Sequence, residues 1–338
     1  MPVTDPNSDP VPTQEPSRGL TRRRFLASVG LLAGAGALAP LLSRTRLGGI
    51  ESLDVTRPAL GTWVRILVRH LDPARAQRAV DRAFAAIARV DAQMSVHRAD
   101  SQLTRVNRLA GEAPAQVDLA LLDMLGISLA AARHTDGLYD PTILPLMRLY
   151  GFYDSGASRY PSDREIAAVE ERVGWRHVTL DRARRTVGLA RPGMGLDLGS
   201  GGKGWAIDRA VEALRAEGVT SALVDAGGNV YGLGAPEPGA PGWTVGVYHP
   251  VTRQAARAFV LRDAAVATSA NYEQYRILGG RRVGHLFDAR RGVPADGHLS
   301  ASVVARTGVE SDVMSLPAFL LGPDRFQWPG ALETCFLG

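Results

Sequence analysis

A glycine-rich segment near the middle of the chain constrains the fold more than any other feature. Residues 199–204 read Gly-Ser-Gly-Gly-Lys-Gly, between a predicted short strand at residues 194–198 and a predicted helix at residues 205–216. Glycines at such a turn permit positive φ angles and a close approach of the backbone to a bound phosphate. The segment therefore predicts a strand–turn–helix unit, with the helix closed by Gly218.

Two interpretations of this segment follow from the residues alone. The spacing G-x-G-x-x-G, with Asp225 about twenty residues later at the end of a strand, matches a dinucleotide-binding fingerprint and a nicotinamide oxidoreductase. Against it, Asp197 would put a carboxylate where a pyrophosphate should bind, and Lys203 lies inside the loop. Gly204 after the lysine excludes a Walker A loop. A glycine turn with a purely structural role is the remaining alternative.

Composition excludes several classes of protein. The 338 residues carry a formal net charge of +5 and no dense basic run with interleaved aromatic residues, so we expect no nucleic-acid binding. Cys335 is the single cysteine, which excludes an internal disulfide and a cysteine-based metal site.

Lys203 is the single lysine in a chain that otherwise uses arginine. A compact ammonium group is therefore a candidate requirement at this position.

The N-terminal residues look like an export signal. Residues 1–20 are rich in Pro, Asp, Ser and Thr and are predicted to be disordered. The segment Thr21-Arg22-Arg23-Arg24-Phe25-Leu26 matches a twin-arginine pattern, and an apolar Gly/Ala-rich stretch follows to Leu42. We assign residues 21–45 to this signal and expect a periplasmic protein, or one at the outer face of the cytoplasmic membrane. Contact with the membrane would be transient or through an uncleaved leader.

The remaining residues, 50–338, are predicted to form one domain of mixed strands and helices. Strand patterns occur at residues 61–68, 178–180, 187–190, 222–224, 244–247, 258–261, 283–287 and 301–304. Helices are predicted after Asp72-Pro73, after Asp118 and near Thr307, which has a capping-box glutamate three residues later. Hairpins mixed with isolated helices favour the α+β class over a doubly wound sheet.

Several segments resemble, in the same order, the signatures of the ApbE family of flavin transferases. Residues 196–208 resemble D-L-G-G-x-A-K-G-Y-A-V-D, with Lys203 on the family's lysine, and residues 224–229 resemble V-D-x-G-G-(E/N). Residues 60–63, 94–107, 136–142, 267–273 and 284–288 resemble further family boxes. The resemblance extends from about residue 55 to 322. It implies an ApbE-type, T-fold-like two-lobed α+β domain.

The resemblance also implies an activity and a set of site residues. Family members use Mg²⁺ to transfer FMN from FAD to a threonine of an FMN-accepting redox protein, releasing AMP. The metal would lie between the Gly202 carbonyl and the Asp312 carboxylate, and oxygen ligands suit Mg²⁺. His285 is the candidate base, although a strand histidine bonded to its neighbour is the alternative. Asp312 is counted as catalytic through the metal, and the FAD contacts implied are Leu60, His97, Leu138, Tyr139, Asp140, Asp197, Lys203 and Asp208.

Departures from the family pattern fall at the same site. The family places a threonine ligand where this chain has Leu316, and Ser315 lies one residue early, about 100° around a helix. Pro317 is expected to kink or break that helix, which could re-aim Ser315 as a metal ligand or leave the metal one ligand short. His97 replaces a tyrosine expected to stack on FAD. A non-catalytic FAD-binding or flavin-delivery protein on the same fold is therefore the main alternative function.

Overall fold

The computed structural model describes residues 41–47, 50–70, 72–153, 157–252, 254–272, 274–295 and 298–338. The predicted disordered residues 1–20, and residues 21–40 of the predicted signal segment, lie outside this part of the chain. Residues 41–45 belong to the first strand of the main sheet. None of the helices within the described ranges has the length and apolar character needed to cross a membrane.

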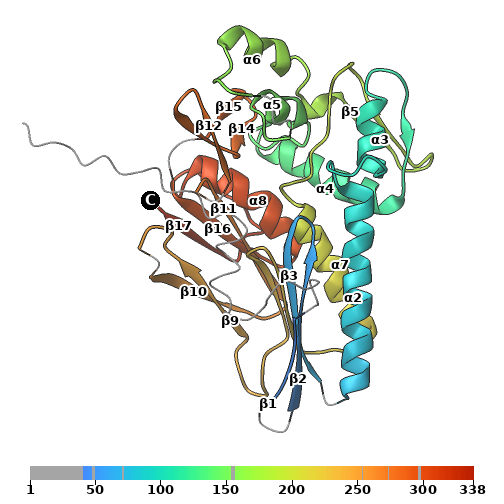
Figure 1. Ribbon diagram of the computed structural model, residues 1–338, viewed down its shortest axis with the longest axis vertical. Coiled ribbons are helices and arrows are strands. Elements are labelled where there is room, and N and C mark those ends of the chain that lie inside the picture. The colour runs from blue at the N-terminus through green and yellow to red at the C-terminus, as the bar shows by residue number, and fades with distance from the viewer. Residues whose placement is uncertain are drawn as a thin grey trace, which may run out of the picture. The chain divides into compact units, whose positions relative to one another are not determined.

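The centre of the molecule is an eight-stranded sheet in the order β1-β2-β3-β7-β8-β11-β16-β17 (Figure 1). Each neighbouring pair in it is antiparallel. Together with the helices, this confirms the predicted α+β class. The strand bounds are β1 Leu41–Leu47, β2 Ile50–Ala59, β3 Thr62–His70, β7 Ala222–Ala226, β8 Asn229–Leu233, β11 Ala264–Ala270, β16 Ser300–Ala305 and β17 Glu333–Leu337.

Three helices cover one face of this sheet: α2 (Pro73–Met94), α7 (Gly202–Ala216) and α8 (Gly308–Leu321) (Figure 1). Helix α2 begins as predicted, because the Asp72 carboxylate accepts hydrogen bonds from the amides of Ala74 and Arg75, and Pro73 occupies the first turn. Its buried side chains, such as Val80, Ile87 and Val90, recur at helical spacing. This face holds the largest apolar core of the described residues.

Pro317 was predicted to kink or break the last helix, and the prediction of a break is wrong. Helix α8 continues through Pro317 to Leu321, and Ser315, Pro317, Ala318 and Phe319 are all buried. A proline inside a helix loses one backbone hydrogen bond, but burial of this helix against β11 and β16 offsets that loss.

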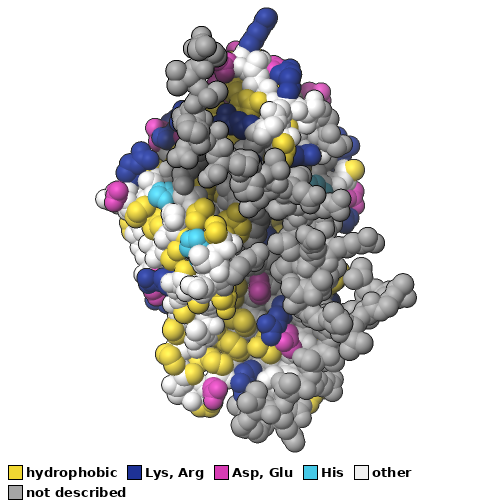
Figure 2. All heavy atoms as spheres, turned by 60° about the vertical axis from the view of Figure 1, so that its left-hand side comes forward, with side chains coloured by type: hydrophobic (Ala, Val, Ile, Leu, Met, Phe, Trp, Pro, Cys, Tyr) yellow, Lys and Arg dark blue, Asp and Glu magenta, His cyan; other side chains and the backbone are white. Residues whose placement is uncertain are grey.

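The opposite face of the sheet is covered by a hairpin of β9 (Trp243–Tyr248) and β10 (Ala255–Leu261). Phe259 and Leu261 pack against Val230 and Val266 of the sheet. The Arg257 guanidinium pairs with Glu333 of β17 at 2.7 Å. Figure 2 shows hydrophobic side chains grouped on the surface of this side of the molecule. The large exposed hydrophobic residues of the β9–β10 hairpin and of the approach to β17 are Tyr248, Val251, Val260 and Leu332.

A second group of short elements lies beyond one end of the sheet (Figure 1). Some of its elements surround a small apolar cluster that includes Leu146, Tyr150, Ile166 and Phe287, and the others contribute side chains to the largest core. The elements are α3 (Gln102–Arg108), β4 (Ala115–Gln116), α4 (Leu119–His134), α5 (Leu144–Leu149), α6 (Asp163–Glu170), a 3₁₀ turn at Trp175–His177, β5 (Val178–Asp181), β6 (Thr186–Leu189), β12 (Tyr275–Leu278), β13 (Arg281–Gly284), β14 (Phe287–Asp288) and β15 (Val293–Pro294).

The predicted strand at residues 194–198 is absent, and this removes the structural context of a dinucleotide fingerprint. The Asn107 side chain takes the place of a neighbouring strand: its amide group donates to the Leu196 carbonyl at 2.9 Å, and its oxygen accepts the Leu196 amide at 2.7 Å. The Asp197 amide donates to the Pro141 carbonyl at 2.8 Å. The glycine loop thus follows an irregular segment beside an antiparallel sheet, whereas a Rossmann fingerprint requires a parallel strand before it.

Candidate active site

The glycine loop leads directly into α7, whose first turn is capped by another helix. Gly201 has φ 109° at the N-cap position and supplies no side-chain cap. The Asp312 carboxylate of α8 instead accepts the Gly204 amide through Oδ2 at 2.9 Å. A carboxylate at a helix N-terminus is stabilised by the free amides and by the helix dipole. The fold therefore brings Asp312 into contact with Gly204, although the two residues are 108 positions apart in the sequence.

The same two helices are joined by a second carboxylate in the reverse direction. The Asp208 oxygens of α7 accept the Gly308 amide at 2.6 Å and the Val309 amide at 2.9 Å, which lie in the first turn of α8. Burial raises the pKa of Asp208 to about 6. Each helix therefore supplies an aspartate that caps the other. These contacts explain Asp208 as a link between the helices, and its contact with FAD stays a prediction.

The crossing of α7 and α8 depends on two glycines. A Cβ added to Gly204 would overlap the Gly308 carbonyl and lie 2.8 Å from the Asp312 Cβ. A Cβ added to Gly308 would in turn lie 2.5 Å from the Gly204 carbonyl oxygen. Only glycine at residue 204 lets the helix backbones approach closely enough for its amide to reach Asp312.

The predicted metal ligands all lie on these two helices. Gly202 opens α7, and the Asp312 carboxylate is buried beside the loop. Ser315 is also buried, and its hydroxyl donates to the Asp312 carbonyl at 2.9 Å and lies 2.8 Å from the Ser269 hydroxyl of β11. Leu316 packs against the apolar core. The serine hydroxyl is thus held between its own helix and the sheet, and Ser269 is an oxygen group that the sequence reasoning did not single out.

Lys203 lies among three of the predicted site residues. Its charge acts on Asp197 and on His285, and the charge of His97 also acts on Asp197. Asp197 is buried, and this burial raises the pKa of its carboxyl. Its Oδ1 accepts the Gly199 amide at 2.7 Å, which fixes the start of the glycine loop. The single lysine, whose significance the sequence left open, is thus near enough to a carboxylate and an imidazole for its charge to act on both.

His285 follows the β12–β13 hairpin, and its environment determines its protonation. Burial, with a contribution from the Lys203 charge, lowers the pKa of His285 to about 4. Nδ1 lies 3.1 Å from the Gln274 carbonyl, which can only accept a hydrogen bond. Nδ1 therefore carries the proton of the neutral ring, and Nε2 keeps a lone pair. His285 is thus hydrogen-bonded to a neighbouring segment, as the alternative interpretation expected. This bond uses only Nδ1, so Nε2 remains available as a base.

The box at residues 138–140 supports the loop from a different side. The Tyr139 hydroxyl donates to the Ser200 carbonyl at 3.3 Å, and burial raises its pKa. The Asp140 oxygens accept the Thr142 amide at 2.8 Å and the Trp175 amide at 2.8 Å. These bonds give Asp140 a structural role between two loops. Leu138 is buried beside it, and direct FAD contacts by this box stay predictions.

Leu60 occupies the turn of the β2–β3 hairpin. It has φ 53° and is followed by Gly61 at φ 70°, so both turn residues are left-handed. A non-glycine residue with positive φ is uncommon. The neighbouring β7–β8 turn, Gly227-Gly228, lies against it: a Cβ at Gly227 would come within 2.8 Å of the Thr62 hydroxyl. The two glycine-containing boxes predicted from sequence therefore form adjacent hairpin turns.

Comparison with known proteins identifies the family. The family model described as "ApbE family" matches residues 60–330. The chain belongs to the ApbE family. A curated relative from Klebsiella pneumoniae, named FAD:protein FMN transferase, is 31% identical over 274 residues, or 79% of this chain and 78% of the relative. A relative of the same name from Treponema pallidum is 31% identical over 283 residues, with the same coverage of both chains.

Solved structures of ApbE proteins share this fold. The crystal structure of the ApbE protein from Thermotoga maritima aligns with a TM-score of 0.73 at 29% identity, covering 80% of this chain and 87% of the other. The flavin transferase ApbE from Vibrio cholerae aligns with a TM-score of 0.73 at 24% identity, covering 85% of this chain and 97% of the other. The predicted recognition of an ApbE-type α+β fold is confirmed.

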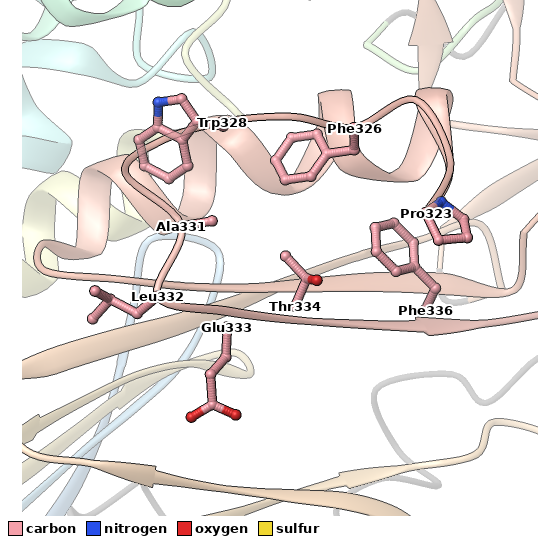
Figure 3. A pocket seen from close by; sticks show the side chains of 8 residues that line it. All are labelled: Pro323, Phe326, Trp328, Ala331, Leu332, Glu333, Thr334 and Phe336. Carbon is pink, nitrogen blue, oxygen red and sulfur yellow. The ribbon is translucent and has the colours of Figure 1, made fainter.

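A pocket elsewhere in this ApbE chain involves none of the predicted site residues. Figure 3 shows it between β17 and the segment after α8, with the Phe326 ring toward Thr334 and Phe336 and the Trp328 ring next to Ala331. Its lining residues are Pro323, Phe326, Trp328, Ala331, Leu332, Glu333, Thr334 and Phe336.

Proposed function

We propose that this ApbE protein is a FAD:protein FMN transferase. The position of Asp312 carries the proposal, because the Gly204 amide fixes this carboxylate at the first turn of α7, next to Lys203. A carboxylate and a single lysine at a glycine loop provide opposite charges beside one backbone surface. Such a surface suits a metal–pyrophosphate group. Membership of a family whose curated members carry this activity name supports the same conclusion.

The reaction is a substitution at phosphorus. The hydroxyl oxygen of an acceptor threonine forms a bond to the FMN-side phosphorus of FAD, and the bond from that phosphorus to the bridging oxygen breaks. AMP leaves with the bridging oxygen, and the threonine proton passes to a base. Nε2 of His285 is the proposed base, because the ring is neutral at neutral pH and its proton lies on Nδ1.

A divalent cation fits the groups that are present. Within the described residues there is no cluster of three His, Cys, Asp or Glu side chains, so a site built from such residues alone is not formed there. The predicted ligand groups on α7 and α8 are oxygens: the Gly202 carbonyl, the Asp312 carboxylate and the Ser315 hydroxyl. One amide occupies Oδ2 of Asp312, and a carboxylate has further acceptor sites. Mg²⁺ bound to these oxygens would neutralise charge on the pyrophosphate.

A transfer assay with the full chain tests the proposal. The chain, FAD and Mg²⁺ are mixed with an FMN-acceptor domain that carries the target threonine, and flavin fluorescence is followed on a denaturing gel. We expect a fluorescent acceptor band that disappears with EDTA and with Asp312→Ala. An acceptor in which the threonine is replaced by alanine is the matched control, and labelling of it would contradict threonine as the site of attachment.

A non-catalytic flavin-binding protein is the second candidate, favoured by two observations. Leu316 is partly buried and packs against the apolar core, at the position where the family is expected to provide a threonine ligand. His97 offers a smaller ring than the tyrosine expected there. Tight FAD binding without transfer to several different acceptors, with or without Mg²⁺, would establish this candidate in place of the transferase.

We further propose twin-arginine export and an FMN-accepting redox protein as the partner outside the cytoplasmic membrane. The pattern at residues 21–26 supports the export route. The test is a fusion of residues 1–50 to a reporter that is active only after export as a folded protein. Replacement of both Arg22 and Arg23 by lysine should abolish export, whereas replacement of Arg18 should not. Export of the double variant would contradict the proposal.

A further inference from the structure

An aromatic residue outside the matched sequence boxes contacts two of the predicted site residues, Asp197 and His97. Tyr153 follows the Gly151-Phe152 pair, and its hydroxyl donates to Oδ2 of Asp197 at 2.5 Å. The other oxygen of Asp197 accepts the Gly199 amide at 2.7 Å. Tyr153 is therefore linked to the glycine loop through one buried carboxylate.

The ring of Tyr153 also pairs with His97. The two ring centroids are 5.1 Å apart and the planes are inclined by 45°. His97 is exposed and Tyr153 is half-buried. The His97 ring therefore presents aromatic surface to solvent next to the partly exposed Tyr153 ring. The charge of Lys203 acts on the same carboxylate that the Tyr153 hydroxyl contacts.

The chain on the N-terminal side of Tyr153 is firmly held. The Phe152 amide donates to the Met147 carbonyl at 2.9 Å. The Phe152 and Phe287 rings pack edge to face, with their centroids 5.9 Å apart. The Arg276 guanidinium of β12 donates to the Gly151 carbonyl. Residues 151–153 therefore connect the β12–β13 hairpin, which His285 follows, to the carboxylate at the start of the glycine loop.

We propose that Tyr153 is a substrate-binding residue whose ring, together with His97, forms a stacking surface for a ring system of FAD. This inference rests on the proposed function. A planar ligand ring gains contact area and electrostatic complementarity against two adjacent aromatic rings. The hydroxyl bond to Asp197 holds the Tyr153 ring in one orientation, so little rotational freedom is lost on binding. Tyr153 thereby supplies the aromatic area that His97 lacks relative to a tyrosine.

The test separates the ring of Tyr153 from its hydroxyl. FAD is titrated into the full native chain and into Tyr153→Phe and Tyr153→Leu in the presence of Mg²⁺, with Kd measured by calorimetry. We expect Tyr153→Leu to weaken FAD binding by about five- to tenfold. Tyr153→Phe retains the ring and should weaken binding by no more than about twofold. Tyr248→Leu removes an exposed tyrosine of β9 and is the matched control.

Two fragments of FAD distinguish the ring systems that could stack. FMN and ADP are titrated into the native chain and Tyr153→Leu. Selective loss of FMN affinity would place the isoalloxazine on the surface, and selective loss of ADP affinity would place the adenine there. His97→Ala combined with Tyr153→Leu should cost less than the product of the two single effects, because the rings act as one surface.

The inference and the proposed function fail in different ways. Native chain that binds FAD and labels an acceptor, while Tyr153→Leu binds FAD as tightly as the Tyr248→Leu control, would overturn the stacking surface alone. Native chain that binds no FAD would overturn both. Equal weakening by Tyr153→Phe and Tyr153→Leu would also overturn it, since the hydroxyl contact and not the ring would then be responsible.

Discussion

At the scale of single residues, two side chains of the proposed site each use one atom in a hydrogen bond that fixes their orientation, while another polar atom stays available for chemistry. The Asp312 carboxylate caps α7 through Oδ2, and the His285 ring is held through Nδ1. In both side chains one atom is used to fix the orientation and another is left for chemistry. A substitution that keeps the first contact and changes the second therefore tests the proposed roles separately from stability.

Asp312→Asn is such a substitution. The asparagine oxygen can still accept the Gly204 amide, so we expect the midpoint of thermal unfolding to change little. Loss of the negative charge should weaken the apparent affinity for Mg²⁺ in the transfer assay by about tenfold or more. Asp324→Asn removes an exposed carboxylate after α8 and is the control. An unchanged Mg²⁺ dependence in Asp312→Asn would argue against this residue as a ligand.

The proposed base makes a prediction about pH. The pKa of His285 is lowered to about 4, so the neutral ring predominates at every pH above that value. We expect kcat/KM to be level between about pH 5 and 8 and to fall as the pH drops through about 4. His285→Gln should lower kcat/KM by roughly 10²- to 10⁴-fold and abolish this acidic limb. An acidic limb near the ordinary histidine pKa would contradict the buried, neutral base.

At the scale of elements, the crossing of α7 and α8 organises the site. Gly204 and Gly308 let the helices approach, and Asp208 and Asp312 cap them reciprocally. This exchange positions the loop carbonyls and the carboxylate relative to one another. The caps are interactions between helices distant in sequence, so neither helix end is fully satisfied without the other.

Gly204→Ala should separate the two helices. The added Cβ would overlap the Gly308 carbonyl, so we expect a loss of about 2 kcal/mol or more in the free energy of unfolding, with reduced transfer activity. Gly126→Ala is the matched control, because this helical glycine of α4 has open space around its Cβ position. It should be neutral or stabilise by about 0.5–1 kcal/mol. Urea unfolding measures both, and equal effects would contradict the close crossing.

The sequence was informative where structure is local and less so where it depends on distant partners. The start of α2, the cap at Thr307 and the strands around residues 244–261 follow from local patterns and are observed. The segment before the glycine loop was wrongly predicted as a strand, because an asparagine side chain 89 residues away replaces the strand partner. Tyr153 was missed because only the fold brings it to Asp197.

The predicted cap at Asp118 shows the same limit. Helix α4 does begin after this residue, but its carboxylate makes no bond to the helix amides. It accepts the side-chain amides of Gln93 and Gln102 instead. Local sequence therefore predicts where a helix starts more securely than it predicts which groups satisfy its end.

At the scale of the whole molecule, the proposed site draws on segments from most of the chain. Its proposed residues come from the β2–β3 turn, the loop after α2, the segment after α5, the glycine loop, the residues that follow the β12–β13 hairpin, and α8. A ligand that bridges these segments binds only when they are folded together. Binding should therefore stabilise the whole described domain rather than one element.

FAD together with Mg²⁺ should raise the unfolding temperature of the chain. A free ligand concentration of about 100 times Kd contributes about 2.7 kcal/mol, which corresponds to a shift of roughly 4 °C for a domain of about 300 residues. Differential scanning fluorimetry with FAD alone, Mg²⁺ alone and both together measures it. We expect the combined shift to exceed the sum of the separate shifts, because Mg²⁺ bound near Asp312 would also contact the pyrophosphate.

NADH under the same conditions should produce no shift, since the antiparallel sheet lacks the parallel strand of a dinucleotide fingerprint. A shift with FAD that is independent of Mg²⁺ and unchanged in Asp312→Asn would instead favour the non-catalytic flavin-binding protein.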